Sequence, residues 1–355
     1  MTTSDDRSKH KYVFVCGMPR SGTSVLGRNV ARLEDCSGFK NTGYLEDEGQ
    51  FLQDVYPVAG ECGGDGRFGF NPRMHLTETS DLLTAENLAR LRTSWDQFWD
   101  KSKTILIEKT PANLLMTRFL QAGFQNSYFV VIRRHPVAVS IAIQKWKINV
   151  TSLYNLFDHW LHCYDLFEQD KKYLKHVYEL RYEDYVEDPD KYHREIAEFI
   201  GTRVPEPPHQ DKFRTVVQWG NPSARVPEGA MEGTTGSYNK KYFERWRGLL
   251  SHSFFRSYYR YAARKYEPKF AQYGYSLIKG LAVSEEALQA GKISDVIGAL
   301  YCLAADAGAF LRRLSVRSSC RLRAAVKAVL PGFVVDWVRQ ARQRRSLNKE
   351  RATIG

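Results

Sequence analysis

The stretch that decides the fold is Tyr12 to Val30, which reads YVFVCGMPRSGTSVLGRNV. Its beginning, Tyr12 to Cys16, is apolar, β-branched or aromatic and predicts a short buried strand. Gly17 to Ser24 follows as a glycine-bounded turn, and a helical pattern begins at Val25. In such a strand–loop–helix unit the loop N–H groups converge and the helix N-terminus adds partial positive charge. The stretch therefore predicts a phosphate-binding loop.

The loop departs from the common nucleotide-binding signature at its cation. Gly17 and Gly22 have the spacing of G-x-x-x-x-G-K-[ST], but Thr23 stands where that signature has lysine. Arg20 carries the positive charge instead, on the other side of the turn. This pattern argues against an ordinary nucleoside triphosphatase. A plain βα connection is the alternative, because glycine and serine are common in such turns.

Length and composition predict a large folded protein with a strongly basic end. The 355 residues, 43% of them hydrophobic, suffice for one large α/β domain with an appendage. The polar first ten residues and the lack of a long apolar run predict a cytoplasmic protein. Six scattered cysteines without a C-x-x-C pair predict reduced thiols and no structural zinc. Of the net charge of +12, residues 312–351 carry +10, from twelve Lys or Arg and two acidic residues.

Strand and helix patterns alternate through most of the chain. Further strands are predicted at Thr104–Ile107, Tyr128–Ile132 and Val177–Tyr182. Helices are predicted between and after them, at Leu82–Trp99, Leu114–Ala122 and Val137–Lys147, with a loop and helix over Glu183–Ile200. Asp35 to Arg73 is expected to be loop-rich. The alternation predicts an α/β fold: a P-loop-like parallel β-sheet flanked by helices.

A positive charge follows each of three predicted strands. Arg20 follows the first strand, Lys109 the second, and Arg133 and Arg134 the third. Because the carboxyl ends of parallel strands meet at one edge of a sheet, we expect these groups to converge. Convergence favours a ligand with more than one phosphate-like group over separate, solvated side chains.

These motifs resemble the sulfotransferase superfamily, which uses 3'-phosphoadenosine 5'-phosphosulfate (PAPS). The resemblance covers Tyr12 to Ser276 and rests on four segments: Pro19–Ser24, Glu108–Pro111, Val131–Pro136, and Arg181–Tyr185 followed by Asp188-Pro189. The pattern is nearer to the bacterial carbohydrate or lipid sulfotransferases and the tyrosylprotein sulfotransferases than to the cytosolic steroid and phenol enzymes. The latter typically carry lysine where Arg20 stands.

The resemblance also implies where PAPS binds. The first loop would hold the 5'-phosphosulfate through Arg20, Ser21, Gly22, Thr23 and Ser24. Arg134 would bind the 3'-phosphate with Ser140, and Tyr182 would contact the nucleotide. The serine lies two residues further on in many relatives. Either Ser140 reaches the phosphate from an altered helix start, or Arg133 instead of Arg134 corresponds to the arginine that binds the 3'-phosphate in the family. No metal is implied.

Charge dictates the catalytic groups of a sulfuryl transfer. Negative charge grows on the leaving phosphate, and Arg20 and Lys109 are the cations that would stabilise it; Lys109 matches a lysine of the tyrosylprotein enzymes. The acceptor hydroxyl also needs a base. Glu48 and Glu46 are the candidates, since related enzymes place a glutamate here, and Glu48 is preferred because the following apolar residues could fix it. Rival bases are His75, His159 and His162.

We expect a catalytic domain at 1–280 and a basic amphipathic helical tail at 281–355. Apolar residues recur at helical spacing from Ile293 to Leu314, and arginines cluster near the end of this pattern. One interpretation is docking on an anionic membrane surface, which would make the protein peripheral on the cytoplasmic membrane face. The other is packing on the catalytic domain, or on another subunit of a homo-oligomer. No nucleic-acid-binding module is recognisable, so no nucleic-acid partner is expected.

The sequence thus predicts a PAPS-dependent sulfotransferase. Its acceptor would be a hydroxyl of a carbohydrate, polysaccharide or lipid-linked molecule, such as a glycan or glycolipid. One alternative is a P-loop kinase-like phosphotransferase using ATP and Mg²⁺, which needs an aspartate after an apolar strand where this chain offers Glu108. The other is a non-catalytic nucleotide-binding protein on the same fold.

Overall fold

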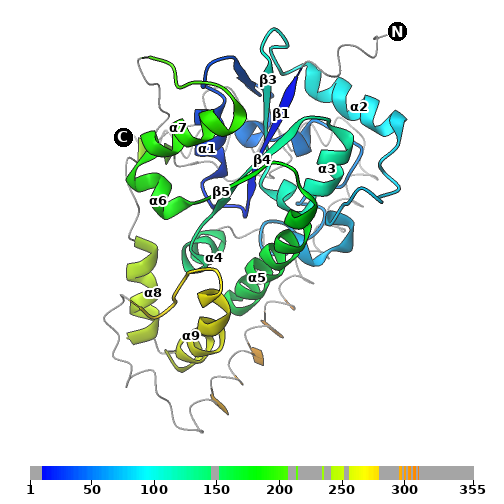
Figure 1. Ribbon diagram of the computed structural model, residues 1–355. Coiled ribbons are helices and arrows are strands. Elements are labelled where there is room, and N and C mark those ends of the chain that lie inside the picture. Colours follow the sequence, from blue (N-terminus) through cyan, green and yellow to red (C-terminus); the bar gives the residue numbers. More distant parts are fainter. Residues whose placement is uncertain are drawn as a thin grey trace, which may run out of the picture. The chain divides into compact units, whose positions relative to one another are not determined.

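A computed structural model of the chain describes most of the predicted catalytic region (Figure 1). The described residues are 10–144, 152–206, 241–251 and 256–279, with short pieces at 213–214, 234–235, 296–297, 300, 303–304, 307–308 and 311. The chain separates into two units, Met1–Asp306 and Ala307–Gly355, and the elements named below lie in the first. The domain boundary expected at 280 and the amphipathic helices expected beyond 311 fall outside the described residues and stay predictions.

A five-stranded parallel sheet forms the centre of the described part, in the order β2-β3-β1-β4-β5. The strands are β1 (Lys11–Gly17), β2 (Cys36–Gly38), β3 (Ile105–Lys109), β4 (Ser127–Arg133) and β5 (Val177–Arg181). The central strand β1 pairs with both β3 and β4, and its residues from Val13 to Cys16 are fully buried. Burial on both faces is typical of parallel sheets and explains why these strands are continuous apolar runs.

Helices cover both faces of the sheet (Figure 1). Alternate residues of β1 point to opposite faces. Val13 and Val15 pack with α1 (Thr23–Val30), α6 (Tyr182–Glu187) and α7 (Pro189–Ile200). Phe14 packs in the larger core on the other face, which also receives α2 (Ala85–Asp96), α3 (Thr117–Gly123), α5 (Leu153–Asp170), α8 (Lys241–Ser251) and α9 (Arg256–Ala271). Helix α4 (Pro136–Gln144) follows β4 and is almost entirely buried. The predicted α/β class is confirmed.

The remaining described elements are short. Six 3-10 turns are present: Leu45–Asp47, Gly49–Phe51, Phe68–Phe70, Pro72–Met74, Pro111–Leu115 and Lys171–Tyr173. Two further strands, β6 (Phe213–Arg214) and β7 (Thr234–Thr235), form an antiparallel pair. The four described cysteines are free and buried. None of the helices described here combines the length and the apolar character needed to span a bilayer.

The structure corrects three details of the predicted elements. The stretch expected to be loop contains the edge strand β2, whose three residues, Cys-Ser-Gly, are too few to show an alternating pattern. The helix expected at Leu114–Ala122 is divided, because Met116 has non-helical backbone angles between a 3-10 turn and α3. The apolar helix expected to fix Glu48 is only the 3-10 turn Gly49–Phe51.

A glycine is required where β1 enters the phosphate-loop candidate. A Cβ on Gly17 would lie 2.3 Å from the carbonyl oxygen of Ile132 in β4, a backbone atom that cannot move aside without breaking the sheet. The backbone φ of Gly17 is +156°. A methyl group at this position would force β1 and β4 apart.

We therefore predict that Gly17→Ala lowers the free energy of unfolding by about 3 kcal/mol or more, measured by urea denaturation. Gly248→Ala is the matched control, because nothing lies within 4 Å of a Cβ at Gly248 in α8. The control should leave stability unchanged or raise it by up to about 1 kcal/mol. Equal stability of the two variants would show that the contact between Gly17 and Ile132 is not rigid.

Candidate active site

The loop between β1 and α1 has the backbone shape of an anion-binding turn. Arg20 and Gly22 both have positive φ, 69° and 97°, and the N–H of Ser21 donates to the carbonyl oxygen of Met18 at 3.1 Å. Helix α1 begins with Gly22 as its N-cap, without a side-chain cap and without an acidic residue in its first turn. The first N–H groups of α1 and its partial positive charge are therefore directed toward the loop, as in phosphate-binding helix N-termini.

Arg134 joins the end of β4 to this loop. Its Nη1 donates to the carbonyl oxygen of Arg20 at 2.8 Å. The Arg134 guanidinium also lies 3.9 Å from the centre of the Tyr182 ring. Tyr182 in turn packs against Gly22, where a Cβ would come within 2.6 Å of the ring. The structure thus brings together the loop, Arg134 and Tyr182, which the sequence predicted to share a ligand.

Arg133, the last residue of β4, points elsewhere. Its guanidinium forms ion pairs with Glu168 at 2.6 Å and Glu179 at 2.9 Å and lies over the ring of Tyr164. Of the two arginines that the sequence left open, Arg134 is therefore the one at the loop.

Two buried polar groups near the start of α4 suit an anion. The Ser140 hydroxyl oxygen and the Arg134 Nε have no hydrogen-bond partner among the described residues, although Ser140 is 1% and Arg134 7% exposed. Buried polar groups are nearly always paired in folded proteins, so each exception calls for an explanation. A phosphate oxygen accepts hydrogen bonds from both kinds of donor. The residues present therefore fit the 3'-phosphate of PAPS.

Lys109, at the end of β3, lies on the other side of the loop. Its side chain packs against Gly27 in α1, where a Cβ would come within 2.9 Å of the Lys109 Cβ. Its Nζ forms an ion pair with Glu48 Oε1 at 3.1 Å. Lys109 is only 8% exposed, so this charge pair is poorly screened by solvent. The structure thus places the cation of Lys109 in direct contact with a candidate base, Glu48.

Glu46 links the positive groups of the site. Its Oε2 accepts a hydrogen bond from Arg28 Nη1 at 3.0 Å. Burial opposes ionisation of this carboxyl, but Lys109, Arg28, a hydrogen bond from Ser24 and the charge of Arg20 outweigh it and lower the pKa of Glu46. The Glu46 carboxylate therefore interacts with cations from the loop (Arg20), from α1 (Arg28) and from β3 (Lys109). These groups share one electrostatic environment.

The turn that carries Glu46 is strained. Glu46 and Asp47 both have left-handed backbone angles, with φ of 59° and 50°, which are unfavourable for residues other than glycine. The side chain of Asp47 holds the turn by accepting hydrogen bonds from the N–H and the hydroxyl of Thr42, at 2.9 and 2.7 Å. Strain of this kind concentrates at functional sites, where the surrounding structure fixes it.

Glu108 positions the acidic loop rather than facing a ligand. Its carboxylate is fully buried and accepts hydrogen bonds from the N–H of Gly49, the hydroxyl of Thr110 and the side-chain amide of Asn113. Burial raises its pKa to about 7, against the lowering effect of these hydrogen bonds. The bond to Gly49 fixes the backbone directly after Glu48. Glu108 is therefore poorly placed for the Mg²⁺ ligand that a kinase-like enzyme needs.

The sequence analysis missed Asp65, which lies in the electrostatic environment of the site. Burial and, to a smaller extent, the negative charge of Glu48 raise the pKa of Asp65 to about 6, against the opposing charge of Arg20. Its only sequence signal is a single acidic residue between Gly64 and Gly66. Arg28, the partner of Glu46, was missed as well, because a basic residue in the exposed pattern of a helix is ordinary.

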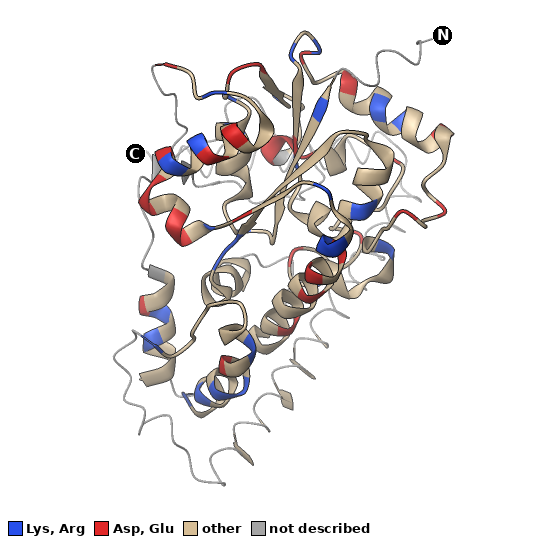
Figure 2. Ribbon diagram, in the orientation of Figure 1, with Lys and Arg blue, Asp and Glu red and all other residues tan. Residues whose placement is uncertain are grey.

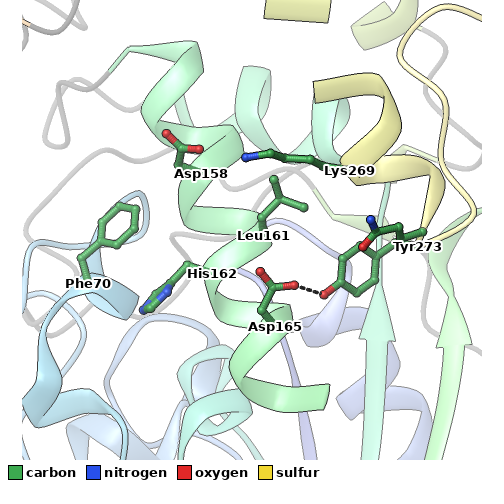
Figure 3. Close-up of a pocket in the computed structure, with 8 residues that line it drawn as sticks. Phe70, Asp158, Leu161, His162, Asp165, Lys269 and Tyr273 are labelled. Atoms are coloured by element: carbon green, nitrogen blue, oxygen red, sulfur yellow. Dashed lines mark hydrogen bonds between the residues drawn. The ribbon is translucent and has the colours of Figure 1, made fainter. Parts of the chain in front are cut away.

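The three histidines proposed as rival bases have other partners. His159 is fully buried, its Nε2 accepts from the N–H of Gly69 at 2.9 Å, and burial lowers its pKa to about 3. His75 pairs with Asp170 at 2.8 Å. His162 stacks on Phe70 and lines an open pocket of about 480 Å³ beside α5. Figure 3 shows this pocket, with the carboxylates of Asp158 and Asp165 on α5, Lys269 on α9 and Tyr273 just after the end of α9.

The chain matches the sulfotransferase family over residues 13–206, which is more than half of its length. It belongs to the sulfotransferase family. The matched segment contains all of the site residues described above. A search of curated proteins finds no match to this sulfotransferase.

Among solved structures, this sulfotransferase is similar to the sulfotransferase domain from the curacin biosynthetic pathway. The two chains are 14% identical, with a TM-score of 0.40 over 72% of this chain and 97% of the other. A sulfotransferase from Alicyclobacillus acidocaldarius is 14% identical, with a TM-score of 0.35 over 68% and 92%. The sulfotransferase STF1 from Mycobacterium tuberculosis is also 14% identical, with a TM-score of 0.40 over 57% and 70%. Family membership rests on the sequence match.

Within the described residues of this sulfotransferase, no cluster of three His, Cys, Asp or Glu side chains could hold a metal ion.

The raised pKa of Asp65 predicts a pH-dependent stability. Because the folded state binds this proton more tightly than the unfolded state, the stabilisation present near pH 4 is lost as the pH rises toward 6. Asp65→Asn removes that loss. Relative to the wild type, we expect the variant to gain roughly 2 kcal/mol between pH 4 and pH 7 in urea unfolding. A stability difference that does not change with pH would show that Asp65 titrates normally.

Proposed function

We propose that this sulfotransferase moves a sulfuryl group from PAPS to a hydroxyl of a carbohydrate, polysaccharide or lipid-linked acceptor. The observation that carries the proposal is the contact of Arg134 with the carbonyl of Arg20 beside an uncapped helix N-terminus. This contact supports a site for two phosphate groups, because one arginine adds a second cationic position next to a phosphate loop. The acceptor class is supported by the resemblance of the strand-end motifs to bacterial carbohydrate or lipid enzymes.

In this proposal two sets of residues bind the two phosphate groups of the donor. The loop Arg20, Ser21, Gly22, Thr23 and Ser24 holds the 5'-phosphosulfate with its N–H groups and the α1 N-terminus. Arg134 and Ser140 hold the 3'-phosphate with the Arg134 Nε and the Ser140 hydroxyl, which have no hydrogen-bond partner among the described residues. Tyr182 contacts the nucleotide from its place between Arg134 and Gly22. When bound, PAPS supplies the sulfuryl group and a phosphate leaving group.

The catalytic roles follow from the charges. Arg20, Lys109 and the loop N–H groups stabilise the negative charge that develops on the phosphate as its bond to sulfur breaks. Glu48 accepts the proton of the acceptor hydroxyl while the acceptor oxygen bonds to sulfur. The ion pair of Lys109 with Glu48 fixes the base beside the cation. Glu46 is the second candidate base; against its burial, the charges of Lys109 and Arg28 lower its pKa, which makes it a weaker proton acceptor.

We predict that Glu48→Gln lowers turnover by about 10²- to 10⁴-fold, because the amide cannot accept the proton. Turnover is measured as transfer of radiolabelled sulfate from PAPS to a total polysaccharide and lipid extract. Lys109→Ala should lower it by a factor on the order of 10² or more. Glu46→Gln is the matched control and should have the smaller effect.

In the two glutamate variants the affinity for adenosine 3',5'-bisphosphate should stay within a few-fold of the wild type, so that a loss of turnover reports on chemistry. If Glu48→Gln turned over as fast as the wild type and Glu46→Gln lost turnover, Glu46 and not Glu48 would be the base. No transfer by the wild type to any fraction of the extract, despite tight nucleotide binding, would favour the non-catalytic alternative.

The two neighbouring arginines give a second test. Arg134→Ala should weaken the binding of adenosine 3',5'-bisphosphate by about 10- to 100-fold in calorimetry, because it removes a charge-assisted contact to phosphate. Arg133→Ala is the matched control; it should leave affinity nearly unchanged and lower only stability, because its partners are Glu168 and Glu179. The opposite ranking would place the 3'-phosphate at Arg133. Preference of the wild type for ATP with Mg²⁺ would favour the kinase-like alternative.

A further inference from the structure

An open pocket of about 480 Å³ lies beside α5 (Figure 3). Helix α5 forms its floor, the 3-10 turn Phe68–Phe70 lies on one side, and the end of α9 lies on the other. Its lining includes two carboxylates, three rings and an ammonium group, which belong to Asp158, Asp165, Phe70, His162, Tyr273 and Lys269. This volume and the convergence of polar groups beside aromatic rings are typical of a small-molecule site.

The pocket lies on the other side of α5 from the proposed nucleotide site. Its polar residues on α5 share one face of the helix, because they are three and four residues apart. Trp160 and Tyr164 lie at least about 100° around the helix from them. The Trp160 Nε1 donates to the carbonyl oxygen of Arg134 at 3.1 Å, and the Tyr164 hydroxyl donates to that of Ile132 at 3.2 Å. The thickness of α5, about 10 Å, therefore separates a ligand in the pocket from the end of β4.

The charges around the pocket favour a ligand without a strong net charge. Figure 2 shows acidic residues along α5 and mainly basic residues along α9. In the pocket itself, the carboxylates of Asp158 and Asp165 stand opposite the ammonium group of Lys269 (Figure 3). Two carboxylates repel a phosphate or sulfate group, and the ammonium group repels a second cation. A neutral polar molecule meets neither repulsion.

The two carboxylates are held in place and keep capacity for a ligand. Asp158 accepts a hydrogen bond from the Tyr266 hydroxyl at 2.6 Å, and Asp165 accepts one from the Tyr273 hydroxyl. A carboxylate has about four acceptor positions, so one tyrosine hydroxyl does not saturate it. Asp165 is exposed, and its oxygens are accessible from the pocket. The floor of the pocket therefore offers positioned acceptors for hydroxyl donors.

A sugar matches these groups. Its hydroxyl groups donate to carboxylates and accept from an ammonium group, which the exposed Lys269 supplies. Its C–H groups form an apolar face that packs on an aromatic ring, and Phe70 presents such a ring with 37% of its surface exposed. We propose that the pocket binds a sugar unit of a polysaccharide acceptor, apart from the hydroxyl that receives the sulfuryl group. The assignment to the acceptor rests on the proposed function, whereas sugar binding does not.

A glycan array probed with the full chain, without PAPS, tests sugar binding independently of sulfate transfer. The array carries neutral, acidic and amine-bearing oligosaccharides. We expect binding to neutral oligosaccharides that persists at about 1 M salt, because contacts to hydroxyl groups are little screened. Phe70→Ala should weaken this binding by about tenfold, and Lys269→Ala by about three- to tenfold. Tyr173→Ala is the matched control, because Tyr173 is an aromatic residue 60% exposed outside the pocket, and should leave binding unchanged.

Transfer of radiolabelled sulfate to the polysaccharide extract connects the pocket with the acceptor. Phe70→Ala should raise KM for the polysaccharide by about tenfold, with kcat within about twofold of the wild type, because it removes only binding that is equal in the ground and transition states. Its affinity for adenosine 3',5'-bisphosphate should not change, since α5 separates the pocket from β4. Lys269→Ala should show the same pattern, and its exposed side chain makes a loss of folding an implausible cause.

The proposal is overturned if the wild type binds no oligosaccharide, or if both pocket variants bind as the wild type does. Binding confined to amine-bearing compounds and abolished by salt would identify a cation site instead. Sugar binding together with an unchanged KM in both variants would show that the acceptor does not use the pocket. Sugar binding that both variants weaken, in a chain that transfers no sulfate, would support the sugar site and contradict the proposed function.

Discussion

The hydrogen bond from Arg134 to the carbonyl oxygen of Arg20 joins the carboxyl end of β4 to the loop that leaves β1. Its geometry depends on the close pairing of these strands, which leaves no room for a side chain at Gly17. The same contact brings the guanidinium against Tyr182, which packs on the loop at Gly22. Ser140 in α4 has a buried hydroxyl without a hydrogen-bond partner among the described residues. Most of the proposed nucleotide site follows from this one junction.

Gathering positive charges at one sheet edge is unfavourable unless negative groups offset them. The acidic turn provides this compensation, since Glu46 pairs with Arg28 and Glu48 with Lys109. Two buried or partly buried carboxyls, Glu108 and Asp65, have raised pKa values nearby because burial disfavours their charged forms. The same carboxylates that balance the cations are thus the candidate proton acceptors of the reaction. The strained backbone at Glu46 is consistent with a functional demand on this turn.

Strong local patterns made the sheet predictable, and the lack of such patterns explains the errors. The apolar runs before Arg20, Lys109 and Arg134 identified three buried strands, and parallel topology then implied that their ends meet. The edge strand β2 has only three residues and is therefore too short to show an alternating hydrophobic pattern. Asp65 was missed because its proximity to the site comes from the fold of a glycine-rich loop, which no local pattern encodes. The choice between Arg133 and Arg134 needed the contacts of the folded chain, which pair Arg133 with Glu168 and Glu179 and Arg134 with the carbonyl oxygen of Arg20.

The most direct measurement of the central claim is a crystal structure of the chain with adenosine 3',5'-bisphosphate. The account predicts that the 5'-phosphate lies on the loop N–H groups between Arg20 and Ser24, and that the 3'-phosphate lies between Arg134 and the Ser140 hydroxyl. It also predicts Lys109 on the side of the 5'-phosphate that faces Glu48. A nucleotide bound away from this strand edge, or phosphates held by Arg133 instead, would contradict it.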